Sequence, residues 1–333
     1  MRRRRARPTV GLALSGGGIR GLAHIGVLRA LRAHGVPIDY ISGTSAGAIV
    51  AALYACGYSV DEIEALARRL EPSEFVDFNL TVSDFIKFGL QELWHDKKRF
   101  WAEVPKGLVK GKRIERYFDA LWGEQSFRDT RIPLAVTAVD VYTADTVFFV
   151  SPCELGLAPS DTRYDRSAMI AEAVRASIAI PGVFFPKEYR GMLLVDGAVK
   201  NNLPTDILRE MGADIVLGVD LGYNGAPCYD VRVTGEVLLR TIDIINRELT
   251  LLKGAVYADH VFRPAVESIG WSDTKKALAA IEIGAKSVEE DWPSMKKIFR
   301  RKMYERLGRI RYGSEKVLCG TGGTCPGDIY DVE

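Results

Sequence analysis

Apolar residues along this chain form two kinds of segment that alternate. Short runs of aliphatic and β-branched residues, such as Thr9–Ser15, Pro37–Ser42 and Asp214–Asp220, have the length and composition of strands that are buried on both faces. Between these runs, apolar residues recur at steps of three and four, which is the spacing of amphipathic helices. The alternation predicts an α/β fold with three layers, in which helices cover both faces of a mostly parallel central sheet.

The same patterns predict the remaining elements. Gly35 ends a first helix that runs to about His34, and a second helix directly follows Ser45. Further predicted helices cover Val60–Leu70, Ile114–Trp122, Ser167–Ile178, Leu203 to about Gly212, Thr234–Lys253, and two segments that end near Leu307. Further predicted strands cover Pro133–Tyr142, Thr146–Val150, Met192–Val195 and Ala258–Arg263, whereas Cys153–Arg166 is predicted to be a loop.

The composition predicts one domain, at about 9–310, because nothing between these positions resembles a linker. Residues 1–8 are predicted to form a basic, disordered tail, and residues 311–333 a tail that contains glycine and the pair Cys319 and Cys325. Inside the domain, residues 75–110 change character, because aromatic side chains alternate with lysines and acids there. This stretch is predicted to be a helical cap, with either a lipid-facing lid or ordinary core packing as its role.

Charge and cysteine content narrow the possible partners and location. The 333 residues have a formal net charge of +2, which gives no general signal for nucleic-acid binding. We therefore expect no nucleic-acid partner, although the basic N-terminus or the aromatic cap could make peripheral membrane contact. No secretory signal is recognised, and the five scattered cysteines do not form a disulfide framework, so a cytoplasmic location is expected. The sequence leaves the oligomeric state open.

A candidate nucleophile lies in Gly43-Thr44-Ser45-Ala46-Gly47, which has the form G-x-S-x-G between a predicted strand and a predicted helix. A sharp turn in this context raises the serine hydroxyl above the sheet edge, and the flanking glycines remove side chains that would clash. Ser45 would also lie at the first turn of a helix, where backbone N–H groups favour negative charge.

The glycine-rich loop from Gly16 to Gly21 has two competing interpretations. Its glycines at 16, 18 and 21 fit the G-x-G-x-x-G pattern of dinucleotide-binding proteins, but the acidic residue at the required distance, Asp39, stands at the start of its strand rather than at its end. The alternative is an oxyanion hole, in which the bare N–H groups of Gly16, Gly17 and Gly18, with Arg20 beside them, stabilise a developing negative charge. If the first two strands are neighbours, this loop and Ser45 emerge side by side.

A serine nucleophile needs a base, and two candidates compete for this role. His260 would complete a Ser-Asp-His triad in chain order, but it lies inside a predicted strand rather than on a loop. Asp196 follows the apolar run Met192–Val195 and precedes Gly197, so its carboxylate should stand at a strand end beside a tight turn. A carboxylate can act as the base when it is held against the hydroxyl in a partly desolvated pocket. His24 is expected to have a packing or hydrogen-bonding role.

Four segments in one order resemble the blocks of the patatin-like phospholipase family: SGGGIRGLAHIGVLRAL, GTSAGAIVAALYA, ASIAIPGVFFP and DGAVKNNLP. The chain is most similar to bacterial members related to the catalytic domain of neuropathy target esterase. The resemblance covers about 9–300, and the order of the glycine loop, the serine turn and Asp196-Gly197-Ala198 makes it specific. Ala198 stands where many members have glycine.

The resemblance implies a Ser–Asp dyad, with Ser45 as nucleophile, Asp196 as proton acceptor, and the Gly16–Gly18 loop with Arg20 as oxyanion hole. It implies hydrolysis of fatty-acyl esters of phospholipids or lysophospholipids, without a metal or another cofactor. Gly21, Gly43, Gly47, Gly197 and Ala198 are then motif residues. A non-catalytic, regulatory lipid-binding protein is the alternative from a different functional class.

Overall fold

The computed structural model describes residues 7–69, 106–222, 234–269 and 274–318. Most of the predicted cap at 75–110 lies outside these ranges, as do Cys319, Cys325 and the first six residues. The last residues of the predicted cap are described, and they form a short strand, β3 (Gly107–Val109), which pairs with β7 (Gly182–Phe184). Among the described helices, none combines the length and the hydropathy that crossing a membrane requires.

Five parallel strands lie at the centre of the main sheet. Their order across the sheet is β11 (His260–Phe262), β10 (Ile215–Val219), β1 (Val10–Leu14), β2 (Tyr40–Thr44) and β4 (Leu134–Asp140). Beyond β4, the strand β5 (Thr146–Val150) is antiparallel and β6 (Thr162–Asp165) runs parallel to β5. The hairpin of β8 (Lys187–Tyr189) and β9 (Met192–Asp196) also joins the sheet at β4.

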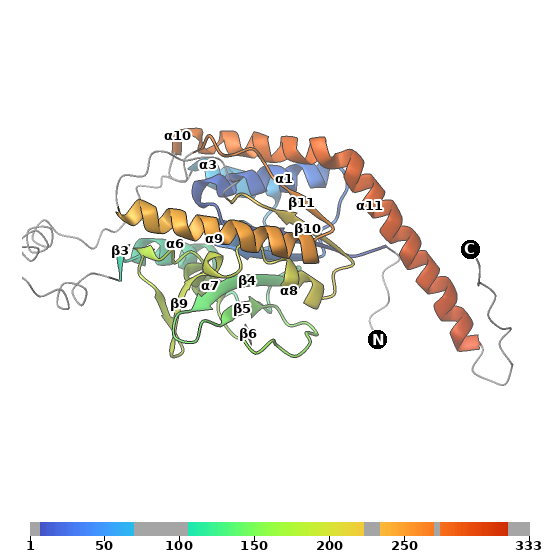
Figure 1. Cartoon of the computed structure of the whole chain (residues 1–333), viewed down its shortest axis with the longest axis horizontal. Coiled ribbons are helices and arrows are strands. Elements are labelled where there is room, and N and C mark those ends of the chain that lie inside the picture. Colours follow the sequence, from blue (N-terminus) through green and yellow to red (C-terminus); the bar gives the residue numbers. More distant parts are fainter. Residues whose placement is uncertain (1–6, 70–105, 223–233, 270–273, 319–333) are drawn as a thin grey trace, which may run out of the picture.

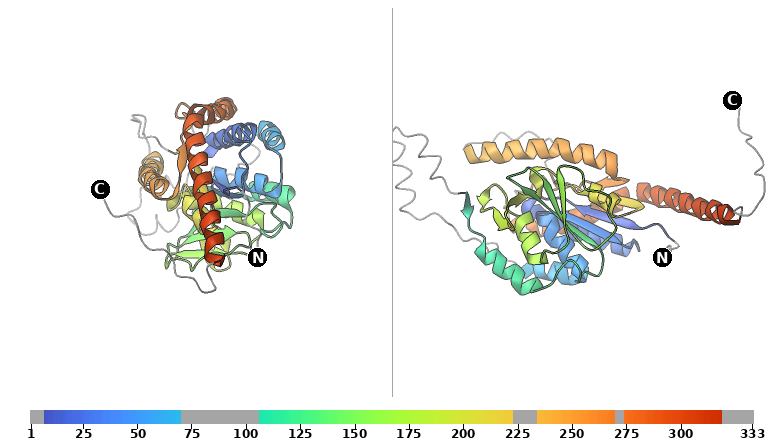
Figure 2. Two further views of the ribbon diagram at one scale, coloured as in Figure 1. Left: turned by 90° about the vertical axis from the view of Figure 1, so that its right-hand side faces the viewer. Right: turned by 90° about the horizontal axis from the view of Figure 1, so that it is seen from below.

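Helices cover both faces of this sheet (Figures 1 and 2). One face is covered by α1 (Ala23–Ala33), α2 (Ala46–Cys56), α7 (Ile170–Ser177) and α11 (Ala279–Leu318), and the other by α8 (Thr205–Glu210) and α9 (Thr234–Tyr257). Within the described ranges, the remaining helices are α3 (Val60–Arg69), α6 (Lys112–Trp122), α10 (Thr274–Ala277) and the 3₁₀-helices η1 (Gly18–Leu22) and η3 (Gly197–Val199).

Successive residues of each central strand belong to different hydrophobic clusters. In β1, for example, Leu12 and Leu14 pack into the larger cluster with α1 and α2, whereas Ala13 packs into the smaller one with α8. Because neighbouring side chains of a strand point to opposite faces, both faces must be apolar, which explains why these strands are continuous apolar runs. The predicted three-layer α/β architecture is confirmed.

Several boundaries differ from the sequence-based predictions. The segment Cys153–Arg166, predicted as a loop, contains β6. Arg7, which the composition assigned to the disordered tail, is held by two hydrogen bonds from its guanidinium to Asp39 (2.7 and 2.9 Å). The last helix continues to Leu318, past the predicted domain limit near 310. Each difference involves long-range contacts or helix continuation, which local patterns of hydrophobicity do not encode.

Two strands that run toward each other bring distant parts of the chain together. Strand β2 pairs with the first half of β4, from Leu134 to Thr137, and β9 pairs antiparallel with the second half, from Ala138 to Asp140. Because β5 occupies the other edge of β4, β2 and β9 share one edge and their carboxyl ends meet there. The residue that follows β2 is Ser45, and the last residue of β9 is Asp196.

Candidate active site

Ser45 occupies the sharp turn between β2 and α2. Its backbone has φ 55° and ψ −125°, a conformation that is rare for residues with a side chain. The backbone N–H of Ser45 donates to the Ser177 hydroxyl at the end of α7 (2.9 Å), which fixes this turn to a neighbouring element. The residue is 5% exposed and lines a cavity, so its hydroxyl is held in a defined place beside the sheet edge.

The glycines on either side of Ser45 are required by close backbone contacts. A Cβ atom on Gly43 would lie 2.4 Å from the carbonyl oxygen of Gly47, and one on Gly47 would lie 2.3 Å from that of Leu14. These distances are far below any real Cβ contact, so a side chain at either position would displace the turn. This is the steric reason for the G-x-S-x-G pattern in this chain.

Asp196 ends β9 and is 2% exposed, facing the same cavity as Ser45. Its Oδ1 accepts a hydrogen bond from the Ala198 N–H (2.8 Å), which orients the carboxyl at the start of η3. Burial raises the pKa of the Asp196 carboxyl to about 7, although hydrogen bonds from the Ser45 side chain and the Ala198 N–H act to lower it. The carboxyl group therefore changes its protonation state near neutral pH. A general base is most effective when its pKa lies near the pH at which it works.

The glycine-rich loop lies next to Ser45 because β1 and β2 are adjacent parallel strands, with Leu14 in register with Gly43. The N–H of Gly16 donates to Asn202 Oδ1 (2.9 Å), so this donor already has a partner. Among the described residues, no hydrogen-bond acceptor is found for the N–H groups of Gly17 and Gly18. Both glycines line the cavity.

Arg20 lines the cavity as well, but its side chain is tied to another loop. Its Nε donates to the carbonyl of Ile269 (2.7 Å). Burial lowers the pKa of the Arg20 guanidinium, while Asp243 and Glu267 nearby act to raise it. The guanidinium thus contributes positive charge to the rim of the site and connects the glycine loop with the segment after β11.

The cavity has a volume of about 150 Å³ and is bounded by six separate parts of the chain. The glycine loop, Ser45 and Asp196 form one side, and Ile180 and Pro181 add apolar surface. Further lining comes from α9 and from the segment after β10. The residues that these two segments contribute are Asp220, Leu221, Gly222, Ile242, Asp243, Asn246, Arg247 and Thr250.

The other polar residues considered as candidates in the sequence do not line the cavity. His260 Nε2 is 2.9 Å from Asp291 Oδ2 of α11, and His260 is not among the residues that line the cavity. His24 is fully buried, with Nε2 2.8 Å from the Ser15 carbonyl, and burial lowers its pKa to about 4. Asp39 accepts from the Val10 N–H (2.9 Å) at the amino edge of the sheet, away from the glycine loop. The hydrogen-bonding role predicted for His24 is confirmed.

Sequence reasoning missed several residues of the site. Ser177 lies in the third family block, ASIAIPGVFFP, and this was the only signal for it. The residues on α9 could not be assigned, because a long amphipathic helix does not reveal which of its polar positions faces a cavity. Among the described residues, no group of three or more His, Cys, Asp or Glu side chains has an arrangement that could hold a metal ion.

Comparison with known proteins identifies the family of this chain. The model of the patatin-like phospholipase family matches residues 12–209. The chain is also 31% identical to an NTE family protein of Mycobacterium tuberculosis, over 85% of this chain and 46% of that protein. This chain belongs to the patatin-like phospholipase family.

Two further relatives extend the comparison. A patatin-like phospholipase domain-containing protein of Caenorhabditis elegans is 29% identical over 83% of this chain and 20% of its own length. The chain thus spans less than half of these curated relatives. Among solved structures, VipD from Legionella pneumophila is similar with a TM-score of 0.50 and 15% identity, covering 86% of this chain and 67% of that one. This similarity concerns the fold, which is the patatin fold.

Proposed function

We propose that this protein is a serine acyl hydrolase that cleaves fatty-acyl esters of phospholipids or lysophospholipids with a Ser45–Asp196 dyad. Membership of the patatin-like phospholipase family supports lipid-ester hydrolysis in general. The single observation that carries the finer proposal is that Ser45 and Asp196, 151 positions apart (196 − 45), line one cavity where β2 and β9 end beside each other.

In the proposed reaction, ionised Asp196 accepts the Ser45 proton while the hydroxyl oxygen attacks the ester carbonyl. The carbonyl oxygen becomes negatively charged and faces the N–H groups of Gly17 and Gly18, whereas the N–H of Gly16 keeps Asn202 in place. Protonated Asp196 then gives its proton to the departing alcohol. Water, deprotonated by Asp196, attacks the acyl-enzyme in the same way and releases the fatty acid.

The charge and hydrogen-bond environment suits this sequence of steps. A carboxylic acid with a pKa of about 7 can both accept and return a proton near neutral pH. The tight turn holds the hydroxyl in the same cavity as the carboxylate before substrate arrives, and such positioning contributes much of the acceleration in enzymes. Each free oxyanion donor is expected to contribute about 10²–10³ in rate.

The decisive experiment combines a lipid panel with a fluorophosphonate probe, which labels activated serines. Wild-type protein should hydrolyse lipid esters and be labelled, whereas Ser45→Ala should lose both properties and Asp196→Asn should lose hydrolysis while remaining folded. His260→Ala serves as the control and should keep most of the activity, because His260 pairs with Asp291 outside the cavity. Loss of activity in His260→Ala together with retention in Asp196→Asn would contradict the dyad and favour a histidine base. An unlabelled wild-type protein would favour the non-catalytic alternative.

A further inference from the structure

Helix α9 has two sides with different chemistry. Its inner side contributes Ile242, Asn246 and Thr250 to the cavity, at steps of four residues. On the outer side, five aliphatic residues are each half exposed or more, between 50% and 62%. These residues, which we call the α9 stripe, are Val237, Ile244, Ile245, Leu252 and Val256.

The spacing of the α9 stripe places it opposite the cavity. Steps of seven, one, seven and four residues keep its members within about one third of the helix circumference. Turning by about 100° per residue puts Asn246 and Thr250 on the other side of the helix. In both views of Figure 2, α9 lies at the periphery of the molecule, so its outer side faces away from the sheet.

A helix at a protein surface normally presents polar side chains to water, so this apolar stripe requires an explanation. From its place directly behind the cavity wall, we infer that the α9 stripe docks on a lipid surface, and this inference rests on the proposed function. Interfacial helices bury an apolar side at the boundary between head groups and acyl chains. A lipid ester leaving that surface would then enter the cavity past the same helix.

The size and charge of α9 favour a lipid surface over a second copy of the chain. A helix of 24 residues is about 36 Å long and, at about 10 Å wide, offers about 360 Å² on one side. A stable dimer needs about 800 Å² per partner. One acid, Glu248, lies on the same side of the helix as the α9 stripe, and its carboxylate pairs with Arg247 (3.1 Å). Among its described residues, this side therefore carries no isolated negative charge that would repel anionic head groups.

The helix is also attached in a way that leaves the stripe available. Its carboxyl-terminal third contacts α8 through an ion pair between Lys253 and Asp206 and through a hydrogen bond from Arg209 Nε to the Tyr257 carbonyl (2.8 Å). These contacts hold the inner side of α9 toward the sheet. Docking on a lipid surface therefore requires no rearrangement of the helix.

The test uses the full chain carrying Ser45→Ala, so that binding is measured without hydrolysis. Sedimentation with vesicles of phosphatidylcholine and phosphatidylglycerol (3:1) compares this parent with a variant that also carries Ile245→Gln and Leu252→Gln. Neither residue lines the cavity. The matched control is Leu307→Gln, because Leu307 is a leucine in the carboxyl-terminal half of α11 that is 51% exposed.

We expect the double substitution to weaken vesicle binding by at least about tenfold, the value for the loss of one well-buried aliphatic side chain. Leu307→Gln should stay within about twofold. With Ser45 present, the double variant should hydrolyse vesicle lipids more slowly but turn over a short soluble ester normally. A parent that does not bind vesicles, unchanged binding in the double variant, or a dimer that this variant dissociates would each overturn the inference. Absence of any Ser45-dependent hydrolysis would instead refute the proposed function.

Discussion

The backbone of Ser45 has a positive φ of 55° although serine carries a Cβ atom, and this strain is offset by the surrounding contacts. Two of these contacts are the hydrogen bond to Ser177 and the close approach of Gly47 to Leu14. The strain is a consequence of raising the hydroxyl at the sharp turn. It should therefore be measurable in variants that lack the hydroxyl.

Comparison of Ser45→Gly with Ser45→Ala isolates this strain. Glycine adopts positive φ without a steric penalty, so we expect Ser45→Gly to be more stable than Ser45→Ala by about 1 kcal/mol, after the greater freedom of unfolded glycine is allowed for. Urea unfolding measures the difference, and both variants should fail to react with a fluorophosphonate. Equal free energies of unfolding would show that the turn is not strained.

The raised pKa of Asp196 predicts how activity depends on pH. As the proposed base, Asp196 must be ionised, so kcat/KM for a soluble ester should rise with pH and level off above an apparent pKa of about 7. Below that value, the rate should fall about tenfold per pH unit. A pH–rate profile of the wild-type protein checks this, and a profile that is flat between about pH 5 and 8 would exclude Asp196 as the base.

The free energy of unfolding should also depend on the ionisation of Asp196, but it should decrease as the pH rises, whereas activity should increase. Because the folded-state pKa of about 7 lies above the ordinary value of 3.8, folding favours protonated Asp196. The stabilisation that comes from the protonated Asp196 carboxyl is complete below about pH 4 and is lost as the pH rises through about 7. Asp196→Asn removes the buried charge, so we expect its melting temperature to exceed that of wild type at about pH 8 but to match it near pH 4. A constant difference at both pH values would contradict this.

At the scale of elements, the contact between α1 and α11 depends on two glycines. A Cβ atom on Gly26 would lie 1.8 Å from the carbonyl oxygen of Ile281, and one on Gly284 would lie 2.0 Å from that of Ala23. The obstructing atoms belong to the backbone and cannot rotate away. The two helices therefore pack at a separation that no residue larger than glycine permits at these positions.

We expect Gly26→Ala or Gly284→Ala to lower the free energy of unfolding by about 1–3 kcal/mol, the usual cost of overpacking, despite the better helix propensity of alanine. The control is Gly254→Ala in α9, where a Cβ would meet no backbone atom, only the side chains of Val261 at 3.2 Å and Leu203 at 4.0 Å. That substitution should be neutral or slightly stabilising. Chemical denaturation of the three variants measures the effect, and equal midpoints would mean that α11 shifts without cost.

How much the sequence could predict also depends on scale. The runs around Leu12 and Leu217 identified buried parallel strands, because apolar side chains on both faces leave a local pattern. The meeting of Ser45 with Asp196 could be expected only from their motifs, since it arises from β2 and β9 sharing one edge of β4. The cavity side of α9 was missed, because the position of a helix relative to the sheet is set by contacts distant in sequence.

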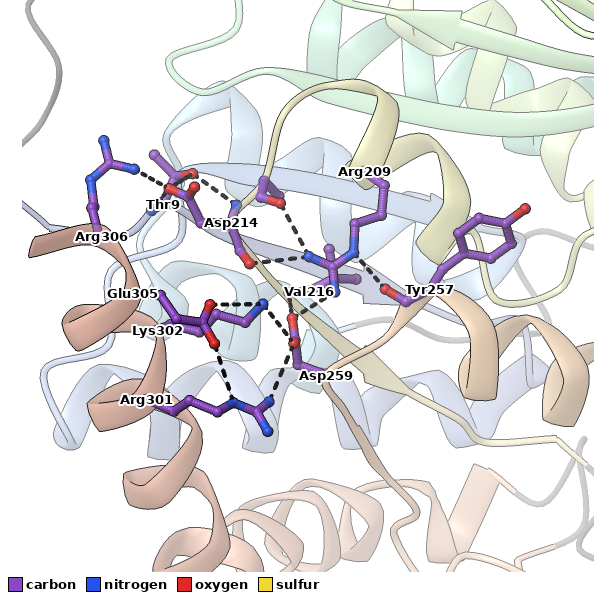
Figure 3. Close-up of polar contacts among 11 residues, drawn as sticks. Thr9, Arg209, Asp214, Val216, Tyr257, Asp259, Arg301, Lys302, Glu305 and Arg306 are labelled. Atoms are coloured by element: carbon purple, nitrogen blue, oxygen red, sulfur yellow. Dashed lines mark hydrogen bonds and ion pairs between the residues drawn. The ribbon is translucent and has the colours of Figure 1, made fainter. Parts of the chain in front are cut away.

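Over the whole molecule, the two ends of the parallel strands differ in function: residues of the candidate site lie at the carboxyl ends, and an ion-pair network lies at the amino ends. Ser45, Asp196 and the glycine loop lie at the carboxyl edge of the parallel strands, whereas Asp214 and Asp259 precede β10 and β11 at the amino edge. Figure 3 shows that Asp214 and Asp259 are surrounded by basic residues of α8 and α11. Arg306 binds Asp214 (2.6 Å), and Arg209 binds Asp259 (2.6 Å). This ion-pair network fastens α11 to the sheet.

Asp259→Asn should therefore weaken the fold without altering catalysis. The Asp259 side chain is 8% exposed, and its carboxylate also binds Lys302 (3.3 Å) and accepts from the Val216 N–H (2.9 Å). Burial raises the pKa of the Asp259 carboxyl, but hydrogen bonds from Val216 and Arg209 and the positive charges lower it below its ordinary value overall. Removing one partner of a buried ion-pair network costs about 3–5 kcal/mol.

The matched control is Asp61→Asn, since Asp61 pairs with Arg32 on the surface, where its side chain is 73% exposed, and such exposed pairs contribute little to stability. Urea unfolding should show a much lower midpoint for Asp259→Asn than for Asp61→Asn, and trypsin should cut α11 faster near Arg301 in the former. At pH 7 and low urea, kcat/KM for a soluble ester should be the same in both. A loss of activity in folded Asp259→Asn would contradict this separation. It would mean that the ion-pair network at the amino ends of the strands also positions the site at their carboxyl ends, through β10 and α9.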